Sequence, residues 1–179
     1  MGVANTIRWP LHLSCEIGPT NFSKVGPVIR AGFQNPENST NAAKVFGYMH
    51  VDPASSGILI DASVIDKLAL SSTDSTEVFA GSANQPMHVS QNLIFRVKLL
   101  IPSIDVDGHN VIAAFPVDAV RVEHPVTGQQ VDVFQSSQAD VVIGRIGRLF
   151  LQFVQMVVAG PTGSIDVTIF EDVMHPKMS

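Results

Sequence analysis

The stretch LFLQFVQMVVAGPTGSIDVTIF, residues 149–170, carries the clearest strand pattern in the chain. Its first half, Leu149 to Ala159, is apolar apart from two glutamines, and its second half alternates apolar Ile165, Val167 and Ile169 with Asp166, Thr168 and Phe170. The segment Gly160-Pro161-Thr162-Gly163 between the halves is rich in turn-forming residues. The whole stretch therefore predicts an antiparallel β-hairpin.

The same period of two appears near the start of the chain, from Ile7 to Ile17. Six residues would share one face: Ile7, Trp9, Leu11, Leu13, Cys15 and Ile17. Strict alternation is typical of a half-buried strand. Pro10 cannot donate a hydrogen bond to a neighbouring strand, so we expect a free edge or a break near it. Gly18-Pro19 ends the run.

Weaker patterns fill the space between these two segments. The strands they predict are Val25 to Phe33, Lys44 to Val51, Leu93 to Ile101 stopped by Pro102, Val117 to Glu123, and Gln130 to Phe134. One helix is predicted over Asp61 to Leu70, where Asp61 can serve as the N-cap and apolar residues share a face. Ser71 to Thr76 is expected to be a loop.

Turn signals recur about every ten residues, which is typical of an all-β sandwich or barrel. The helical patterns that parallel βαβ units need between strands are missing, so a parallel βαβ architecture is disfavoured. A chain of 179 residues can form one core without a metal or disulfide. We therefore predict one antiparallel β-sandwich domain over residues 1–179, with at most one or two short helices.

Composition excludes several partners. Charged residues make up only 15% of the chain and the net charge is -5, so the polar surface must depend largely on neutral side chains. No basic arm or cluster is present, which predicts weak nucleic-acid contact at most. The start lacks the features of a signal peptide, and no apolar run reaches the length of a membrane helix. The sequence thus predicts a soluble protein without membrane contact.

Cys15 and His12 are the first candidates for catalysis, because a thiol nucleophile needs an imidazole within hydrogen-bonding distance. Residues three apart on a strand point to opposite faces, so an inert, buried Cys15 is expected. The six histidines do not show the spacing of metal ligands: His12, His50, His88, His109, His124 and His175. Solvated or hydrogen-bonded histidines are the preferred interpretation, and a pH-sensitive subunit contact is the alternative.

Acidic residues give no assignable site either. Asp105-Val106-Asp107-Gly108 resembles the start of a calcium loop, but the rest of that pattern is absent, so a solvated turn is predicted. A carboxylate pair such as Asp61 with Asp66, or Asp118 with Glu123, is defined by its separation in space and cannot be assigned from sequence. No nucleotide-binding or nucleophile-elbow motif occurs. We therefore predict no catalytic, cofactor-binding or metal-binding residue, no cofactor and no enzymatic activity.

Two short motifs remain. The sequons at Asn21 and Asn38 match the N-glycosylation pattern, which is short enough to arise by chance, and without a signal sequence they are expected to be unused. Gly144-Arg145-Ile146-Gly147-Arg148 places two arginines beside glycines and offers an anion clamp. The alternative, two arginines at a turn leading into a strand, is preferred.

Taken whole, the low charge, the abundance of small polar residues and the closing hairpin resemble viral jelly-roll coat subunits. The resemblance depends most on Leu149 to Val173, which is similar to the last two strands of capsid jelly rolls followed by a tail. It implies a jelly-roll fold and a place in the virion. Because many coat proteins begin with a basic arm and this chain does not, it points to an armless subunit or a decoration protein.

The function expected from this resemblance is a non-enzymatic structural subunit of a virus or phage particle, which associates with copies of itself and with other virion proteins. The alternative is a ligand-binding β-sandwich, such as a carbohydrate-binding or lectin-like module. A single Trp and a single Tyr disfavour that alternative, because sugar sites commonly stack on such rings. The sequence leaves any small-molecule ligand unknown.

Overall fold

The computed structural model describes residues 7–37, 43–80, 88–122 and 142–170. Its centre is a six-stranded barrel in which neighbouring strands pair in the order β2, β3, β8, β4, β7 and β6, and pairing of β2 with β6 closes the ring. The barrel strands are β2 (Val28–Gln34), β3 (Lys44–Val51), β4 (Ile58–Asp61), β6 (His88–Ile104), β7 (Asn110–Val122) and β8 (Val142–Ile146).

Two pairs of barrel strands run parallel, β3 with β8 and β4 with β7. The prediction of a single antiparallel jelly-roll sandwich is therefore wrong, because the chain forms a mixed barrel. The parallel pairs are not the βαβ units that the sequence disfavoured. Strands β3 and β8 are about ninety positions apart, with β4, β6 and β7 between them in the chain, and no local pattern indicates such a distant pairing.

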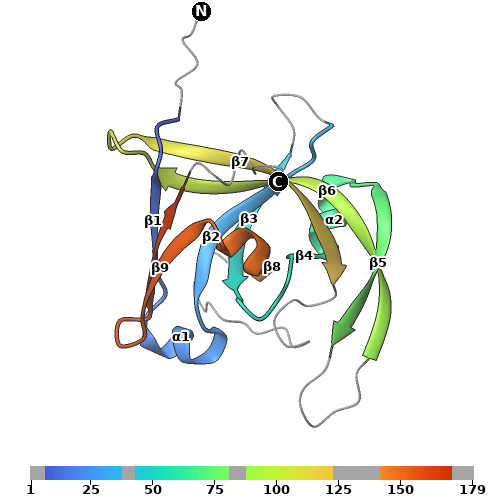
Figure 1. Ribbon diagram of the computed structural model, residues 1–179, viewed down its shortest axis with the longest axis horizontal. Coiled ribbons are helices and arrows are strands. Elements are labelled where there is room, and N and C mark those ends of the chain that lie inside the picture. Colours follow the sequence, from blue (N-terminus) through green and yellow to red (C-terminus); the bar gives the residue numbers. More distant parts are fainter. Residues whose placement is uncertain (1–6, 38–42, 81–87, 123–141, 171–179) are drawn as a thin grey trace, which may run out of the picture.

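Two further parts extend from β6 (Figure 1). On one side, β1 (Leu11–Glu16), β10 (Ser164–Ile169) and β9 (Val154–Ala159) form an extension sheet, joined to β6 through the pair His12 and Ile104. On the other side, β5 (Ser72–Ala80) pairs with residues 88–95 of β6 to form a two-stranded arm. Figure 1 shows β1 and β9 at one side of the molecule and β5 at the other.

Strand β1 confirms the alternation predicted for it, since Leu11, Leu13 and Cys15 are buried and the residues between them are exposed. The strand begins at Leu11, directly after Pro10, as expected from the missing N–H group. The hairpin of β9 and β10 is also confirmed, with Ile165, Val167 and Ile169 buried.

Pro102 does not end β6 as predicted, because it lies opposite Ile112 within the ladder to β7. On the other side of β6, β2 pairs with residues 98–100 and β1 with residue 104, so Pro102 falls in the gap between two partners. A missing N–H group has no consequence there. The strand continues to Ile104.

The beginning of the predicted strand from Leu149 is helical instead, forming α3 (Arg148–Leu151). The amides of Arg148 and Leu149 donate to the carbonyls of Ser55 and Ser56, at 2.8 and 3.0 Å. These contacts hold the chain against the turn that precedes β4. A tertiary contact thus overrides an apolar pattern that strands and buried helices share.

Three elements had no clear signal in the sequence: α1 (Pro19–Val25), β4 and β5. Strand β4 is only four residues long. Strand β5 begins with the Ser/Thr-rich segment that was predicted as a loop, and residues 72–75 are exposed. The predicted helix is confirmed as α2 (Ala62–Leu68), with Asp61 as its N-cap. The predicted strand at 130–134 lies outside the described residues.

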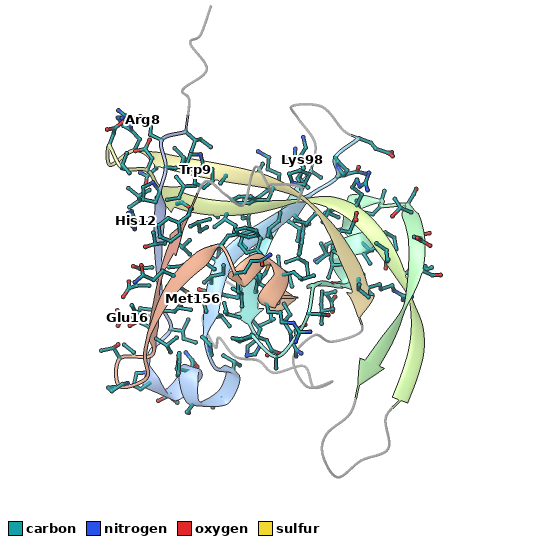
Figure 2. The ribbon with its side chains drawn as sticks, viewed as in Figure 1. Arg8, Trp9, His12, Glu16, Lys98 and Met156 are labelled. Atoms are coloured by element: carbon teal, nitrogen blue, oxygen red, sulfur yellow. The ribbon has the colours of Figure 1, made fainter. Side chains whose placement is uncertain are left out.

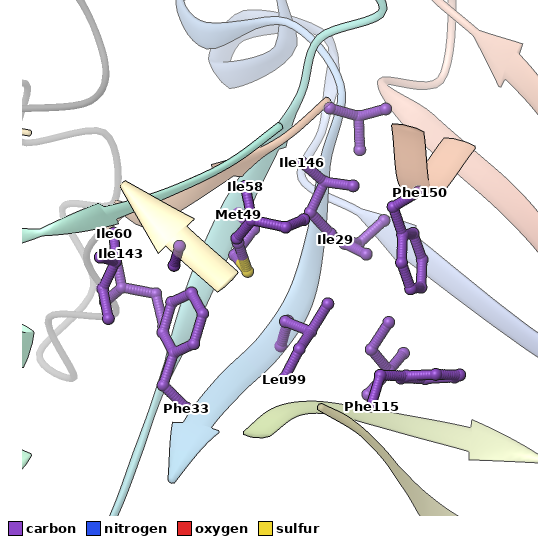
Figure 3. Packing of buried hydrophobic residues seen from close by; sticks show 14 of the residues in the cluster. Ile29, Phe33, Met49, Ile58, Ile60, Leu99, Phe115, Ile143, Ile146 and Phe150 are labelled. Atoms are coloured by element: carbon purple, nitrogen blue, oxygen red, sulfur yellow. The ribbon is translucent and has the colours of Figure 1, made fainter. Parts of the chain in front are cut away.

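One apolar core fills the barrel and continues beneath the extension sheet. Phe33 of β2, Met49 of β3 and Leu99 of β6 are fully buried inside the barrel. Figure 3 shows these side chains packed with Ile60 and Ile143. Phe115 of β7 stands edge-on to Phe150 of α3, with ring centroids 5.2 Å apart, so the short helix is fixed to the barrel by an aromatic contact.

Candidate functional site

Asp61 lies at the point where three parts of the fold meet. It is the last residue of β4, which runs between β7 and β8, and it is followed at once by helix α2. Short β4 ends there because the Asp61 side chain accepts a hydrogen bond from the backbone N–H of Ser63, which starts the helix. The residue is half-buried, so its carboxylate keeps contact with solvent.

The register places Asp61 at the end of the barrel from which the arm projects. Leu59 of β4 pairs with Val120 of β7, and Val120 pairs with Ile94 of β6, so these three residues form one row. Asp61 is two residues beyond that row, about 7 Å along the strand, in the direction in which β6 enters the arm. A carboxylate thus stands at the base of a two-stranded arm.

The Asp61 carboxylate is oriented by Ser63. Its Oδ1 accepts from the Ser63 amide at 2.9 Å and from the Ser63 hydroxyl at 2.5 Å. Among the described residues, these are the hydrogen bonds of this carboxylate. Asp66, which the sequence offered as a carboxylate partner, is exposed one turn further along α2. The carboxylates of Asp61 and Asp66 therefore do not form a hydrogen-bonded pair.

A second polar cluster lies at the parallel joint of β3 and β8. His50 and Arg145 are direct neighbours in the register, and Arg145 forms an ion pair of 3.1 Å with Asp52. In the anion clamp that the sequence offered as the less favoured interpretation, Arg145 is paired with a carboxylate of the same chain. Arg148, its second arginine, is exposed in α3. Arg145 of this motif thus links β8 to the residue that directly follows β3.

His50 is held in this cluster with its Nδ1 atom buried and without a hydrogen-bond partner among the described residues. Burial lowers the pKa of His50, and the positive charge of Arg145 lowers it further. The Asp52 carboxylate and a hydrogen bond to the Val25 backbone oppose this effect. His50 is therefore kept neutral at pH values where an ordinary histidine begins to protonate.

Asp105, Asp107 and His109 come together at the turn between β6 and β7, with ligand atoms within 4.8 Å of one another. Sequence reasoning treated the Asp-Gly turn and His109 separately. The buried Asp105 carboxylate accepts from the backbone amides of His109 and Asp107, and these bonds, the one to His109 first, lower its pKa. Asp107 also pairs with Arg8 at 3.1 Å. The sequence predicted a solvated turn, and the structure buries Asp105 in it while Asp107 and His109 are exposed.

Cys15 and His12 lie on opposite faces of β1, as strand geometry predicts. His12 is exposed and its Nδ1 is 3.1 Å from the hydroxyl of Thr168. Burial raises the pKa of the Cys15 thiol, which keeps it protonated and unreactive. Figure 2 shows His12 with Arg8 and Glu16 along the outer side of the extension sheet.

The remaining candidate site residues do not come together in the described part of the structure. Asn21 lies in α1 and donates to the Ile17 carbonyl at 2.9 Å. Asp118 pairs with Arg96 at 3.3 Å on the exposed face of β6 and β7. Several residues weighed in the sequence lie outside the described residues, namely Asn38, Glu123, His124 and His175, while the side chain of His88 is not described.

Comparisons with known proteins gave one kind of match. No family model matches the chain, and no curated protein does. Among solved structures, it can be aligned with a retropepsin-like aspartic protease from Rickettsia conorii, at 12% identity and a TM-score of 0.37, over 91% of this chain and 97% of that one. In the described part of the chain, no helix is long and apolar enough to cross a membrane.

These findings correct the functional predictions. The virion subunit was inferred from a jelly roll, and the chain forms a mixed barrel instead. The predictions of a virion protein and of a sugar-binding module depended on a sandwich fold that the chain does not form, so both are corrected, and the prediction of no enzymatic activity is replaced by the proposed function. A virion localisation has no support.

Sequence reasoning used Asp61 as a helix cap and as one of several carboxylates that could not be assigned. The sequence does not reveal the register of β4 with β7 and of β7 with β6, which places residues 59, 120 and 94 in one row. The cluster of His50, Asp52 and Arg145 was missed for the same reason. Arg145 lies more than ninety positions after His50 and Asp52, and no local pattern joins β3 to β8.

Proposed function

We propose that this chain is a hydrolase of the aspartic-peptidase type, and that Asp61 supplies one of its two reactive carboxylates. The observation that carries the proposal is the position of Asp61, half-buried at the barrel end beneath the β5–β6 arm. An extended peptide laid between the arm and the barrel end would pass beside this carboxylate. The arm would hold the substrate against the barrel end.

Chemistry of this type needs two carboxylates about 3 Å apart that share one proton. One acts as a general base on the attacking water, and the other donates a proton to the carbonyl oxygen or the leaving amine. Within the described residues, the Asp61 carboxylate accepts hydrogen bonds from Ser63 alone. The proposed site is therefore completed by Asp61 of a second copy, related by a two-fold axis.

Replacement of Asp61 by Asn separates catalysis from helix capping. Asn caps helices about as well as Asp, so Asp61→Asn should leave the free energy of unfolding within about 0.5 kcal/mol of wild type. It removes the ionisable carboxylate, so hydrolysis of an unstructured protein substrate should fall at least about 100-fold. Asp66→Asn, one turn along the same helix, is the matched control and should keep full activity.

Mixing of the two proteins tests where the second carboxylate comes from. If both copies contribute Asp61, hybrids of wild type and Asp61→Asn are inactive, and an equal mixture that has exchanged subunits keeps about a quarter of the activity rather than about half. A folded Asp61→Asn variant with full activity would overturn the proposal. So would the absence of hydrolysis by wild type across a peptide library between about pH 3 and pH 8.

A further inference from the structure

Strand β9 is an open edge of the extension sheet. It pairs with β10 on one side, and in the described part of the chain no strand pairs with its other side. Its sequence, Val-Gln-Met-Val-Val-Ala, contains no charged residue and no proline. Natural edge strands are usually protected by such residues, by bulges or by a covering element. The β9 to β10 register is continuous, so no bulge protects this edge.

Apolar side chains are exposed along this edge. Val157 is 57% exposed and Val158 is 49% exposed, on opposite faces of β9. Leu149 in α3 and Phe170 after β10 are also exposed. In the part of the chain whose side chains the structure describes, four of the eight exposed large hydrophobic residues therefore lie on β9 and the segments beside it. Solvent exposure of an unprotected apolar edge is unfavourable, and pairing with another strand would remove it.

We propose that two copies of this chain pair through β9, antiparallel and across a two-fold axis centred on Met156. The sequence of β9 is self-complementary in this register. Met156 faces Met156 of the second copy, Val154 faces Val158, and Gln155 faces Val157. Facing residues share one side of a sheet, so the row on the core side contains only valine and methionine. The sheets of the two copies become continuous.

The distribution of charge favours a second copy as the occupant. Two chains of net charge -5 repel each other, and they approach with least repulsion along a strand that bears no charge. The nearest acidic residue on the paired strand is Asp166, opposite Val157 on β10. Across the proposed pair, the two Asp166 residues are at least three strand spacings apart, about 14 Å, which exceeds the Debye length of about 8 Å at physiological salt.

The size of the contact sets its strength. A six-residue strand with the side chains beside it covers less than the roughly 800 Å² per partner of a standard stable interface. We therefore expect dimers that dissociate on dilution in the micromolar range rather than permanent ones. This inference depends on the edge strand and does not rest on the proposed function.

Sedimentation velocity over a range of concentrations tests the pairing. Wild type should shift from monomer to dimer as its concentration rises. Val158→Lys places a charge in the apolar row and should weaken the dimer at least about tenfold. Ile112→Lys is the matched control, because Ile112 is also 49% exposed but lies on β7, away from this edge. It should dimerise like wild type.

Cross-linking tests the register. Facing residues of an antiparallel pair have Cα atoms about 4.5–5.5 Å apart, which suits a disulfide. With the native thiol removed by Cys15→Ser, Met156→Cys should form a disulfide-linked dimer under mild oxidation, whereas Ala159→Cys should not. A wild type that stays monomeric at several hundred micromolar, about 100-fold above a micromolar dissociation constant, would overturn the inference. Equal weakening by the two lysine variants would also overturn it.

The two proposals can fail separately. Cross-linking through residue 156 does not depend on Asp61, so a β9 dimer without hydrolysis would remove only the proposed function. Asp61-dependent hydrolysis at full specific activity by Val158→Lys, together with a wild-type dimer that Met156→Cys does not cross-link, would remove only the β9 pairing.

Discussion

Gly147 occupies a position at which no side chain fits. A Cβ atom there would lie 2.5 Å from the carbonyl oxygen of Gly57 and 2.6 Å from that of Ser55, and both of these are backbone atoms. The same turn accepts the amides of Arg148 and Leu149. The close approach of two backbones thus anchors α3 beside the start of β4, which ends at Asp61.

Gly147→Ala should therefore destabilise the protein by about 2–3 kcal/mol, the usual cost of forcing an extra carbon into a packed site. Urea unfolding followed by circular dichroism measures the loss. Gly160→Ala provides the control, since nothing lies within 4 Å of a Cβ atom there and the backbone is not left-handed. Its effect should stay within about 0.5 kcal/mol. Similar losses for both variants would contradict the close-approach argument.

His50 predicts a pH dependence whose sign follows from its lowered pKa. Below its ordinary pKa of 6.5 the unfolded chain binds a proton that the folded chain resists, so acid favours unfolding. The stability that neutral His50 contributes is complete above that value and is lost as the pH falls toward the folded pKa. His50→Gln cannot titrate. Its free energy of unfolding should therefore fall less than that of wild type between about pH 7.5 and pH 5. Parallel pH profiles would contradict the assignment.

At the scale of elements, the sequence predicted those strands whose burial is one-sided. Strand β1 and strand β10 alternate buried and exposed residues, and both were found from that pattern. Helix α2 was found from its cap, because Asp61 bonds to the Ser63 amide as expected. In each case a local rule and the tertiary environment agree.

Elements shaped by distant contacts were missed. Strand β5 is polar at its start and was predicted as a loop, because its strand conformation depends on pairing with β6 rather than on burial of one face. Helix α3 was predicted as a strand, because its first amides bond to Ser55 and Ser56. The candidate site has the same origin, since its position at the arm depends on a row of pairs from β4 through β7 to β6.

At the scale of the whole molecule, the pairing of β2 with β6 is the feature that makes this fold a barrel and not a sandwich. Gly32, Phe33 and Gln34 pair with β6 residues 98–100, although more than sixty positions separate the two segments. Alternation along single strands does not record which strands meet. A sandwich and a barrel therefore share the same local pattern, and the sequence left them undistinguished.

The single domain predicted for residues 1–179 implies one cooperative unfolding transition. The barrel and the extension sheet share one buried cluster, which contains Leu11 and Ile169 as well as Phe33 and Met49. Trp9, the only tryptophan, lies before β1 and stands edge-on to Phe115 of the barrel strand β7, with ring centroids 6.2 Å apart. Trp9 fluorescence should therefore report the joint between the two parts, while far-ultraviolet circular dichroism reports all strands.

Phe115→Ala tests whether the joint couples them. Phe115 is 2% exposed and contacts both Trp9 and Phe150, so its truncation should cost about 3–5 kcal/mol. If the chain folds as one unit, fluorescence and circular dichroism will give the same urea midpoint in wild type, and the variant will lower both midpoints equally. Phe153→Leu, a milder change at a half-buried position after α3, should lower both midpoints together by less. Separate midpoints, with the fluorescence transition first, would show that the extension sheet unfolds independently of the barrel, because the barrel could then keep its six paired strands while Trp9 is released.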